Sequence, residues 1–192
     1  MKHLKMLGLF AMAAAALMAF AGSASAQTFT APAGTEYTST IDATLEGSAL
    51  LKAGFAEITC TTGTVAGTIT TNNNTEASGP ITGPKSGVSF SNCKEGQTVD
   101  TLSSVGNLTI LKSTKAVSGT GVEVTTAVGG VSCVYGLGAT ATSLGTATNT
   151  ASGVTLAISA KLPKISGGFL CASPATWTAN YIVTSPEGSV LD

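Results

Sequence analysis

Basic side chains are scarce in this sequence: His3 is its only histidine, and it contains no arginine. Residues 27–192 therefore cannot form a Ser–His–Asp or Cys–His catalytic arrangement, or a histidine-ligated zinc, copper or iron site. Two of the nine lysines, Lys2 and Lys5, precede residue 27, so seven lysines stand against ten acidic residues in the remainder. That part has a net charge near −3 and no basic patch, so we expect no nucleic-acid binding.

Carboxylates are the chemically active groups that the composition leaves. Two of them are enough for glycoside hydrolysis, but sugar cleavage usually takes place in a cleft rich in aromatic side chains, and aromatics make up only 5% of this chain. A calcium site needs clustered oxygen ligands, and no D-x-D sequence occurs. We therefore expect no catalytic residues, no cofactor and no metal site.

The N-terminal segment, residues 1–26, has the pattern of a cleaved signal peptide. Lys2, His3 and Lys5 form a positive start, an apolar stretch covers residues 7–21, and "ASAQ" at 24–27 supplies small residues at the cleavage position. A membrane anchor is the alternative, but about 15 apolar residues are too few to span a bilayer. We expect residues 1–26 to be removed and residues 27–192 to form a single secreted domain, without membrane attachment after cleavage.

Four cysteines lie in the expected mature part, as an even number typical of disulfide bonding in exported proteins. A zinc site is the competing interpretation, but zinc ligands usually come in close pairs, and these cysteines are all far apart along the chain. Internal similarity favours one pairing, because "ITCTTGTVAGTITTN" at 58–72 resembles "VSCVYGLGATATSLGTATN" at 131–149. We predict two related halves, closed by the bridges Cys60–Cys93 and Cys133–Cys171.

Alternation of polar and apolar residues predicts strands along most of the chain. The segment 153–163 places five apolar residues on one face, and the segment 36–47 has the same period of two. Clusters of Gly, Asn, Pro and Ser separate the strands, and the cluster at 71–87 predicts a long exposed loop. The expected fold is all-β, a single antiparallel β-sandwich or jelly-roll-like domain.

The stretch "ATWTANYIVTSP" at 175–186 contains the only tryptophan of the chain. Alternation places Trp177, Ala179, Tyr181 and Val183 on one face of a strand, which favours packing of the two rings in the core. The alternative is a ligand-binding surface formed by Trp177 and Tyr181. Both interpretations place the two rings on the same face.

Three segments together resemble an uncharacterised family of small secreted β-rich proteins from actinobacteria. They are the segment 1–26, the "ITGP…VSFSNC" region and the ending "SPATWTANYIVTSPEG". The resemblance covers nearly the whole chain but implies no activity, ligand or catalytic residue. In size, export signal, Gly/Thr/Ser-rich strands and scattered cysteines the chain is also similar to the PraB-type proteins, which are secreted surface proteins associated with alkane use and biofilms.

Two classes of function follow from these patterns. The first is a non-catalytic secreted or cell-surface protein that contacts matrix polymers or other copies of itself, because few lysines protect its strand edges from pairing. The second is a secreted binding protein for a small apolar or carbohydrate ligand near Trp177 and Tyr181. The sequence does not identify the partner.

Overall fold

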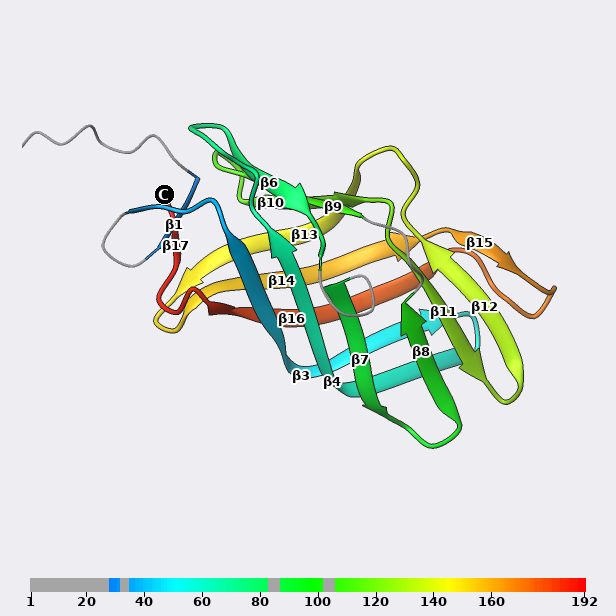
Figure 1. The fold of residues 1–192 in the computed structure, drawn as a ribbon. Coiled ribbons are helices and arrows are strands. Elements are labelled where there is room, and N and C mark those ends of the chain that lie inside the picture. The colour runs from blue at the N-terminus through cyan, green and yellow to red at the C-terminus, as the bar shows by residue number, and fades with distance from the viewer. Residues whose placement is uncertain (1–27, 32–34, 83–86, 102–105) are drawn as a thin grey trace, which may run out of the picture.

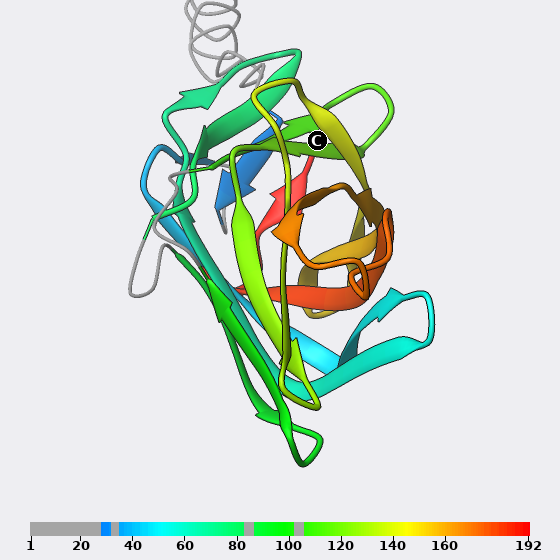
Figure 2. The same cartoon turned by 90° about the vertical axis from the view of Figure 1, so that its right-hand side faces the viewer.

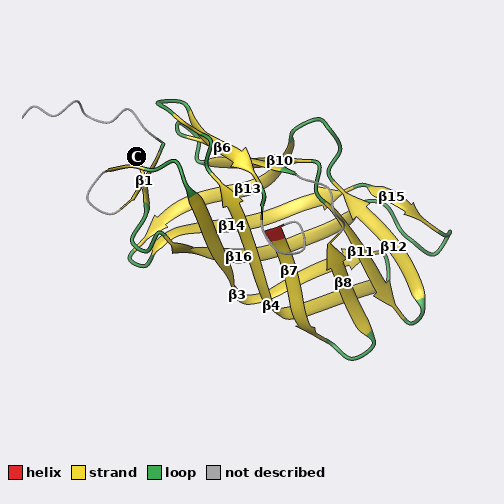
Figure 3. Cartoon of the chain, in the orientation of Figure 1, coloured by secondary structure: helices red, strands yellow, loops and turns green. Residues whose placement is uncertain are grey.

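The structure is a computed structural model that describes residues 28–31, 35–82, 87–101 and 106–192 (Figure 1). The predicted signal peptide, residues 1–26, lies outside the described residues. Strands dominate the described chain, with only a short helical turn at Gly87 (Figure 3).

Seventeen strands are present in the described residues. In chain order they are β1 (Phe29–Ala31), β2 (Thr35–Glu36), β3 (Thr40–Ala53), β4 (Ala56–Thr68), β5 (Thr71–Asn72), β6 (Glu76–Pro80), β7 (Val88–Cys93), β8 (Gln97–Thr101), β9 (Asn107–Leu111), β10 (Ala116–Thr120), β11 (Glu123–Val128), β12 (Val131–Gly136), β13 (Thr142–Thr150), β14 (Gly153–Leu162), β15 (Lys164–Gly167), β16 (Ala175–Ser185) and β17 (Val190–Leu191).

These strands form three antiparallel sheets. The largest has ten strands in the order β5-β6-β9-β10-β13-β14-β16-β3-β4-β7, the second has the order β15-β12-β11-β8, and the smallest has the order β17-β1-β2. In Figure 1 the smallest sheet lies at the left end of the molecule and the four-stranded sheet at the right end. The predicted all-β, antiparallel, sandwich-like fold is confirmed.

The ten-stranded sheet curls strongly, and its strands surround a central interior when the molecule is viewed end-on (Figure 2). Gly67 of β4 bridges to Ile81, which directly follows β6. The Thr82 amide also donates to the Ala66 carbonyl at 2.9 Å. Strands from opposite parts of the sheet therefore meet, and their inner faces share one core.

The strongest alternating patterns occupy the middle of this sheet. In β14 the predicted inward face is buried at every position: Val154, Leu156, Ile158, Ala160 and Leu162. β14 pairs with β16, and β16 pairs with β3. β3 keeps its buried face across an irregularity near Gly47, because Leu45 and Ala49 are four residues apart and remain on the same side.

Both predicted disulfides are present, and each lies within its predicted half of the chain. Cys60–Cys93 joins paired positions of β4 and β7. Cys133–Cys171 joins β12 to the segment between β15 and β16. The strands of the two halves nevertheless interleave, since β16 from the second half lies against β3 from the first.

The prediction of a long exposed loop at 71–87 is wrong for its described part. β5 and β6 form a hairpin there, and β6 pairs with β9 at the end of the ten-stranded sheet. Ala77 and Ile81 are buried. The cluster of polar residues was misleading because Asn72 bonds to main-chain groups of a neighbouring strand instead of facing only solvent.

Candidate functional site: an apolar cavity between the sheets

The alternation in β16 directs Trp177 and Tyr181 toward the interior, as predicted. Trp177 pairs with Ala160 of β14 and with Leu51 of β3. Tyr181 pairs with Leu156 and Leu45 on the same two strands. The two aromatic residues therefore lie on an interior strand of the sheet, between apolar neighbours on β14 and β3.

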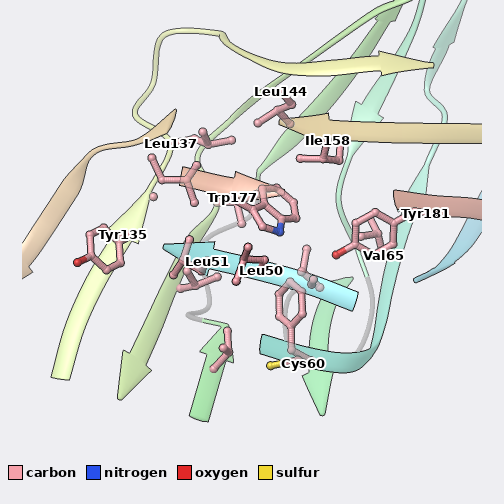
Figure 4. A pocket seen from close by; sticks show the side chains of 18 of the residues that line it. Leu50, Leu51, Cys60, Val65, Tyr135, Leu137, Leu144, Ile158, Trp177 and Tyr181 are labelled. Carbon is pink, nitrogen blue, oxygen red and sulfur yellow. The ribbon is translucent and has the colours of Figure 1, made fainter. Parts of the chain in front are cut away.

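A cavity of about 70 Å³ lies beside these two side chains (Figure 4). Its walls come from the ten-stranded sheet and from β8, β11 and β12 of the four-stranded sheet. Aliphatic and aromatic side chains form nearly all of the lining, and none of its described lining residues is charged. A largely apolar lining is typical of small-molecule sites, whose volumes are usually about 300–1,000 Å³, so this cavity suits only a very small ligand.

Three aromatic rings meet at the cavity. The Trp177 ring is edge-on to Phe90 with ring centroids 6.4 Å apart, and edge-on to Tyr181 at 6.3 Å. Positions four apart in a strand are separated by about 13 Å along the backbone, so the two rings of β16 lean toward each other. Between them, Ala179 carries only a methyl group, which leaves space for this approach.

The contribution of Phe90 was not expected from the sequence. It lies on β7 opposite Gly63 of β4, and a side chain at Gly63 would come within 3.3 Å of the Phe90 ring. The absent side chain therefore leaves room for the ring. A glycine in the middle of a strand is the one sequence signal for such a close approach, but it does not identify the aromatic partner.

Two polar atoms at the cavity have no protein hydrogen-bond partner among the described residues. They are Nε1 of Trp177 and the hydroxyl of Tyr181, both enclosed by the protein. In Figure 4 the Tyr181 hydroxyl lies on the side of its ring that faces Trp177. Burial raises the pKa of Tyr181 well above its usual value, because the phenolate would be poorly solvated there.

Tyr135 provides an internal comparison, because it lines the same cavity. Its hydroxyl donates a hydrogen bond of 3.0 Å to the carbonyl oxygen of Ala172. Burial also raises the pKa of Tyr135. Buried hydroxyl groups in proteins are normally bonded in this way, so the two unpartnered groups of β16 are exceptions.

A second, smaller cavity of about 50 Å³ lies next to the first and shares the side chains of Leu51, Ile58 and Tyr135 with it. Its outer wall includes Phe55, which is 84% exposed at the tip of the β3–β4 hairpin, and Leu170. Apolar side chains thus extend from the interior to this end of the molecule.

The remaining predicted site residues, the four cysteines, all form disulfide bonds. Cys60 lines the main cavity and Cys133 the second one, and both are consumed in disulfides. Two such bridges are typical of an oxidising compartment outside the cytoplasm. In the described ranges, no group of three or more His, Cys, Asp or Glu side chains is arranged to hold a metal ion.

No helix among the described residues has the length and apolar character needed to cross a membrane. Searches of protein-family models, curated proteins and solved structures found no match to the chain.

Proposed function

We propose that this protein is a non-catalytic, secreted binding protein that holds a small apolar ligand beside Trp177 and Tyr181. The observation that carries the proposal is the apolar cavity between the two sheets. Apolar cavities bind small apolar molecules because water competes poorly for a space without polar partners. A carbohydrate fits less well, since its many hydroxyl groups need polar side chains that the described lining lacks.

Secretion is part of this proposal. The signal-like segment 1–26 and the two disulfides support it. We propose binding without catalysis because residues 27–192 contain no histidine and no arginine, and because no described lining residue of the cavity is charged.

The test is a titration of the protein with dissolved xenon and with cyclopropane, which are small enough for a cavity of about 70 Å³, followed by Trp177 emission and by calorimetry. We expect saturable binding with a change in emission, because the cavity lies against the only indole of the chain. Ala49→Leu should abolish binding, since Ala49 is a buried lining residue and the larger side chain fills the space.

Ala116→Leu is the matched control, because Ala116 is half-buried in β10 and is not among the lining residues. Circular dichroism and thermal unfolding of both variants establish that they fold. Equal binding by Ala49→Leu and by the wild-type protein, or no saturable binding by the wild-type protein, would show that the cavity is not a ligand site.

Self-association is a second candidate function, supported by exposed apolar side chains at one end of the molecule. Phe55 is 84% exposed and Phe169 is 94% exposed. A side chain at Gly54 would lie 3.0 Å from Cβ of Ala172, so the hairpin tip and the segment before β16 are neighbours. Isolated apolar residues on a surface are ordinary, but a group of them at one end is typical of a contact site.

Sedimentation velocity over a wide concentration range tests this second function. We expect a concentration-dependent dimer that the double variant Phe55→Ser/Phe169→Ser reduces. Leu111→Ser is the control, because Leu111 is a partly exposed apolar residue on β9. A protein that stays monomeric at the highest concentration contradicts self-association and leaves the ligand-binding proposal intact.

A further inference from the structure

The two ends of β16 differ in the charge of the side chains around them. Near its start, Thr176 lies between Lys161 of β14 and Lys52 of β3. At its other end, Asp42 is paired with the last residue of the strand, and Glu187 follows two residues later. All four charged residues are exposed. Because β16 has 11 residues, the two lysines lie about 33 Å from the two acidic residues.

The lysines lie at the same end of the molecule as the most exposed aromatic side chains. Phe55, which is 84% exposed, follows Lys52 by three residues, and Phe169, which is 94% exposed, lies between β15 and β16. Phe55 and Leu170 line the same small cavity, and Figure 2 views this end of the molecule. We call the surface formed by Lys52, Lys161, Phe55 and Phe169 the basic apolar end.

The opposite end offers an acidic surface with an exposed apolar residue. Asp42 lies near the start of β3, Glu187 lies in the turn before β17, and Val190 of β17 is 38% exposed. We call these three residues the acidic end, which lies beside the small sheet at the left of Figure 1. Within the described ranges, neither these two carboxylates nor the two lysines of the basic apolar end form an ion pair.

We infer that the basic apolar end binds the acidic end of a second copy, so that copies associate head to tail. This inference rests on self-association, the second candidate function, and names the surface that the apolar end contacts. In a contact between two basic apolar ends, lysines would face lysines, which is unfavourable. A head-to-tail contact instead places lysines beside carboxylates and covers the exposed rings of Phe55 and Phe169.

A head-to-tail dimer still has one uncovered basic apolar end and one uncovered acidic end. Such contacts continue into longer chains unless the copies close into a ring. We therefore expect the wild-type protein to form a dimer first and larger assemblies as its concentration rises. Sedimentation velocity at a series of protein concentrations measures this growth.

The effect of salt separates the two kinds of contact. Raising the ionic strength from about 0.01 M to about 0.15 M shortens the Debye length from about 30 Å to about 8 Å. Head-to-tail association should weaken by about threefold, because screening reduces the attraction between lysines and carboxylates. Association through two basic apolar ends should strengthen, because screening reduces the repulsion between lysines.

Asp42→Asn/Glu187→Gln removes both negative charges of the acidic end with almost no change in shape. It should weaken association by about tenfold, because two charge pairs across the contact are lost. Glu46→Lys is the matched control, because it raises the net charge by the same amount and lies opposite Asn180 in the middle of β16. It should change association by less than about twofold. Circular dichroism establishes that both variants fold.

A mixture of two variants gives the most direct measurement. Phe55→Ser/Phe169→Ser loses the rings of the basic apolar end and keeps the acidic end, and Asp42→Asn/Glu187→Gln has the reverse combination. The mixture therefore retains one intact pair of surfaces. It should form a 1:1 complex about tenfold more stable than the self-association of either variant, and no longer chains.

The outcomes separate the head-to-tail contact from self-association itself. Full association of Asp42→Asn/Glu187→Gln alone, with no 1:1 complex in the mixture, overturns the head-to-tail contact and leaves self-association intact. A wild-type protein that stays monomeric contradicts both. If that monomer floats with vesicles of phosphatidylcholine and phosphatidylglycerol, the basic apolar end binds an anionic lipid surface instead of a second copy.

Discussion

The small sheet at one end of the molecule and the cavity beside Trp177 differ in what surrounds their enclosed polar groups. In the small sheet, one side chain bonds four main-chain groups: Oδ1 of Asn72 accepts from the amides of Thr28 and Phe29, at 3.1 and 3.0 Å. Its Nδ2 donates to the carbonyls of Phe29 and Tyr37, at 2.6 and 3.0 Å. At the cavity, the two polar groups of Trp177 and Tyr181 have no such partner.

Asn149 of β13 forms a similar arrangement with β17, the neighbour of β1 in the small sheet. Its Oδ1 accepts from the Leu191 amide at 2.7 Å, and its Nδ2 donates to the Leu191 carbonyl at 2.8 Å. Thus Asn72 binds β1 and Asn149 binds β17, and the two strands pair with each other. Polar side chains here stabilise the structure by bonding its main chain.

The small sheet also encloses two hydroxyl groups without a partner among the described residues, those of Thr30 and Ser189. Neither residue lines the main cavity or the smaller one next to it. The groups of Trp177 and Tyr181 differ in that they belong to side chains that line the main cavity, although neither polar atom is itself accessible from it. A buried polar group without a partner lowers stability, so these four groups weaken the fold where the bonds of Asn72 and Asn149 strengthen it.

The largest expected effect comes from removing the bonds of Asn72. Asn72→Ala leaves four main-chain groups in and beside the small sheet without their partner and should lower the free energy of unfolding by about 3 kcal/mol. Urea unfolding measures this. Asn149→Ala removes two bonds and should lower the free energy of unfolding by about 2 kcal/mol.

Asn74→Ala is the control for both changes, since Asn74 is exposed in the turn between β5 and β6. It should change the free energy of unfolding by less than about 0.5 kcal/mol. A similar loss in all three variants would mean that the asparagine bonds do not hold the small sheet.

A second expected effect is a loss of stability at high pH from the cavity tyrosine. Burial raises the pKa of Tyr181 in the folded protein above its value of about 10 in the unfolded chain. The unfolded chain therefore loses this proton first, so the stabilisation is complete below about pH 10 and declines above it. Through Tyr181 alone, the free energy of unfolding should fall by about 1.4 kcal/mol per pH unit in that range, and Tyr135 adds to the decline.

Urea unfolding between pH 8 and 11.5 measures this decline. Tyr181→Phe should make it shallower by about 1.4 kcal/mol per pH unit. Tyr135, whose pKa burial also raises, contributes in the same direction and remains in the variant. An unchanged slope in Tyr181→Phe would mean that the Tyr181 hydroxyl is solvated in the folded protein.

Local patterns in the sequence predicted much of this fold. The alternation over 153–163 identified the buried face of β14, and the alternation after residue 175 placed Trp177 and Tyr181 on one face. The two disulfides followed from internal similarity. These features depend on neighbours along the chain or on repeated spacing, both of which a sequence displays.

Contacts between strands that are far apart in sequence could not be predicted from local patterns. The hairpin of β5 and β6 looked like a loop because residues 71–87 are a cluster of Gly, Asn, Pro and Ser. The side chain of Asn72 in this cluster nevertheless bonds to β1, which lies far earlier in the chain. The position of Phe90 beside Trp177 depends on the order of β7, β4, β3 and β16 in the sheet. Whether a polar atom has a partner is likewise decided only by strands far apart in sequence.

The smallest expected effect is a change in the free energy of unfolding that has opposite signs for Tyr181→Phe and Tyr135→Phe, although both tyrosines line the same cavity. At pH 7, Tyr181→Phe removes a buried hydroxyl without a protein partner and should raise the free energy of unfolding by about 1 kcal/mol. Tyr135→Phe removes a hydroxyl bonded to Ala172 and should lower it by about 1 kcal/mol. Urea unfolding of both variants measures the difference. Equal losses would show that the Tyr181 hydroxyl is bonded in solution, and the contrast between the cavity and the small sheet would then disappear.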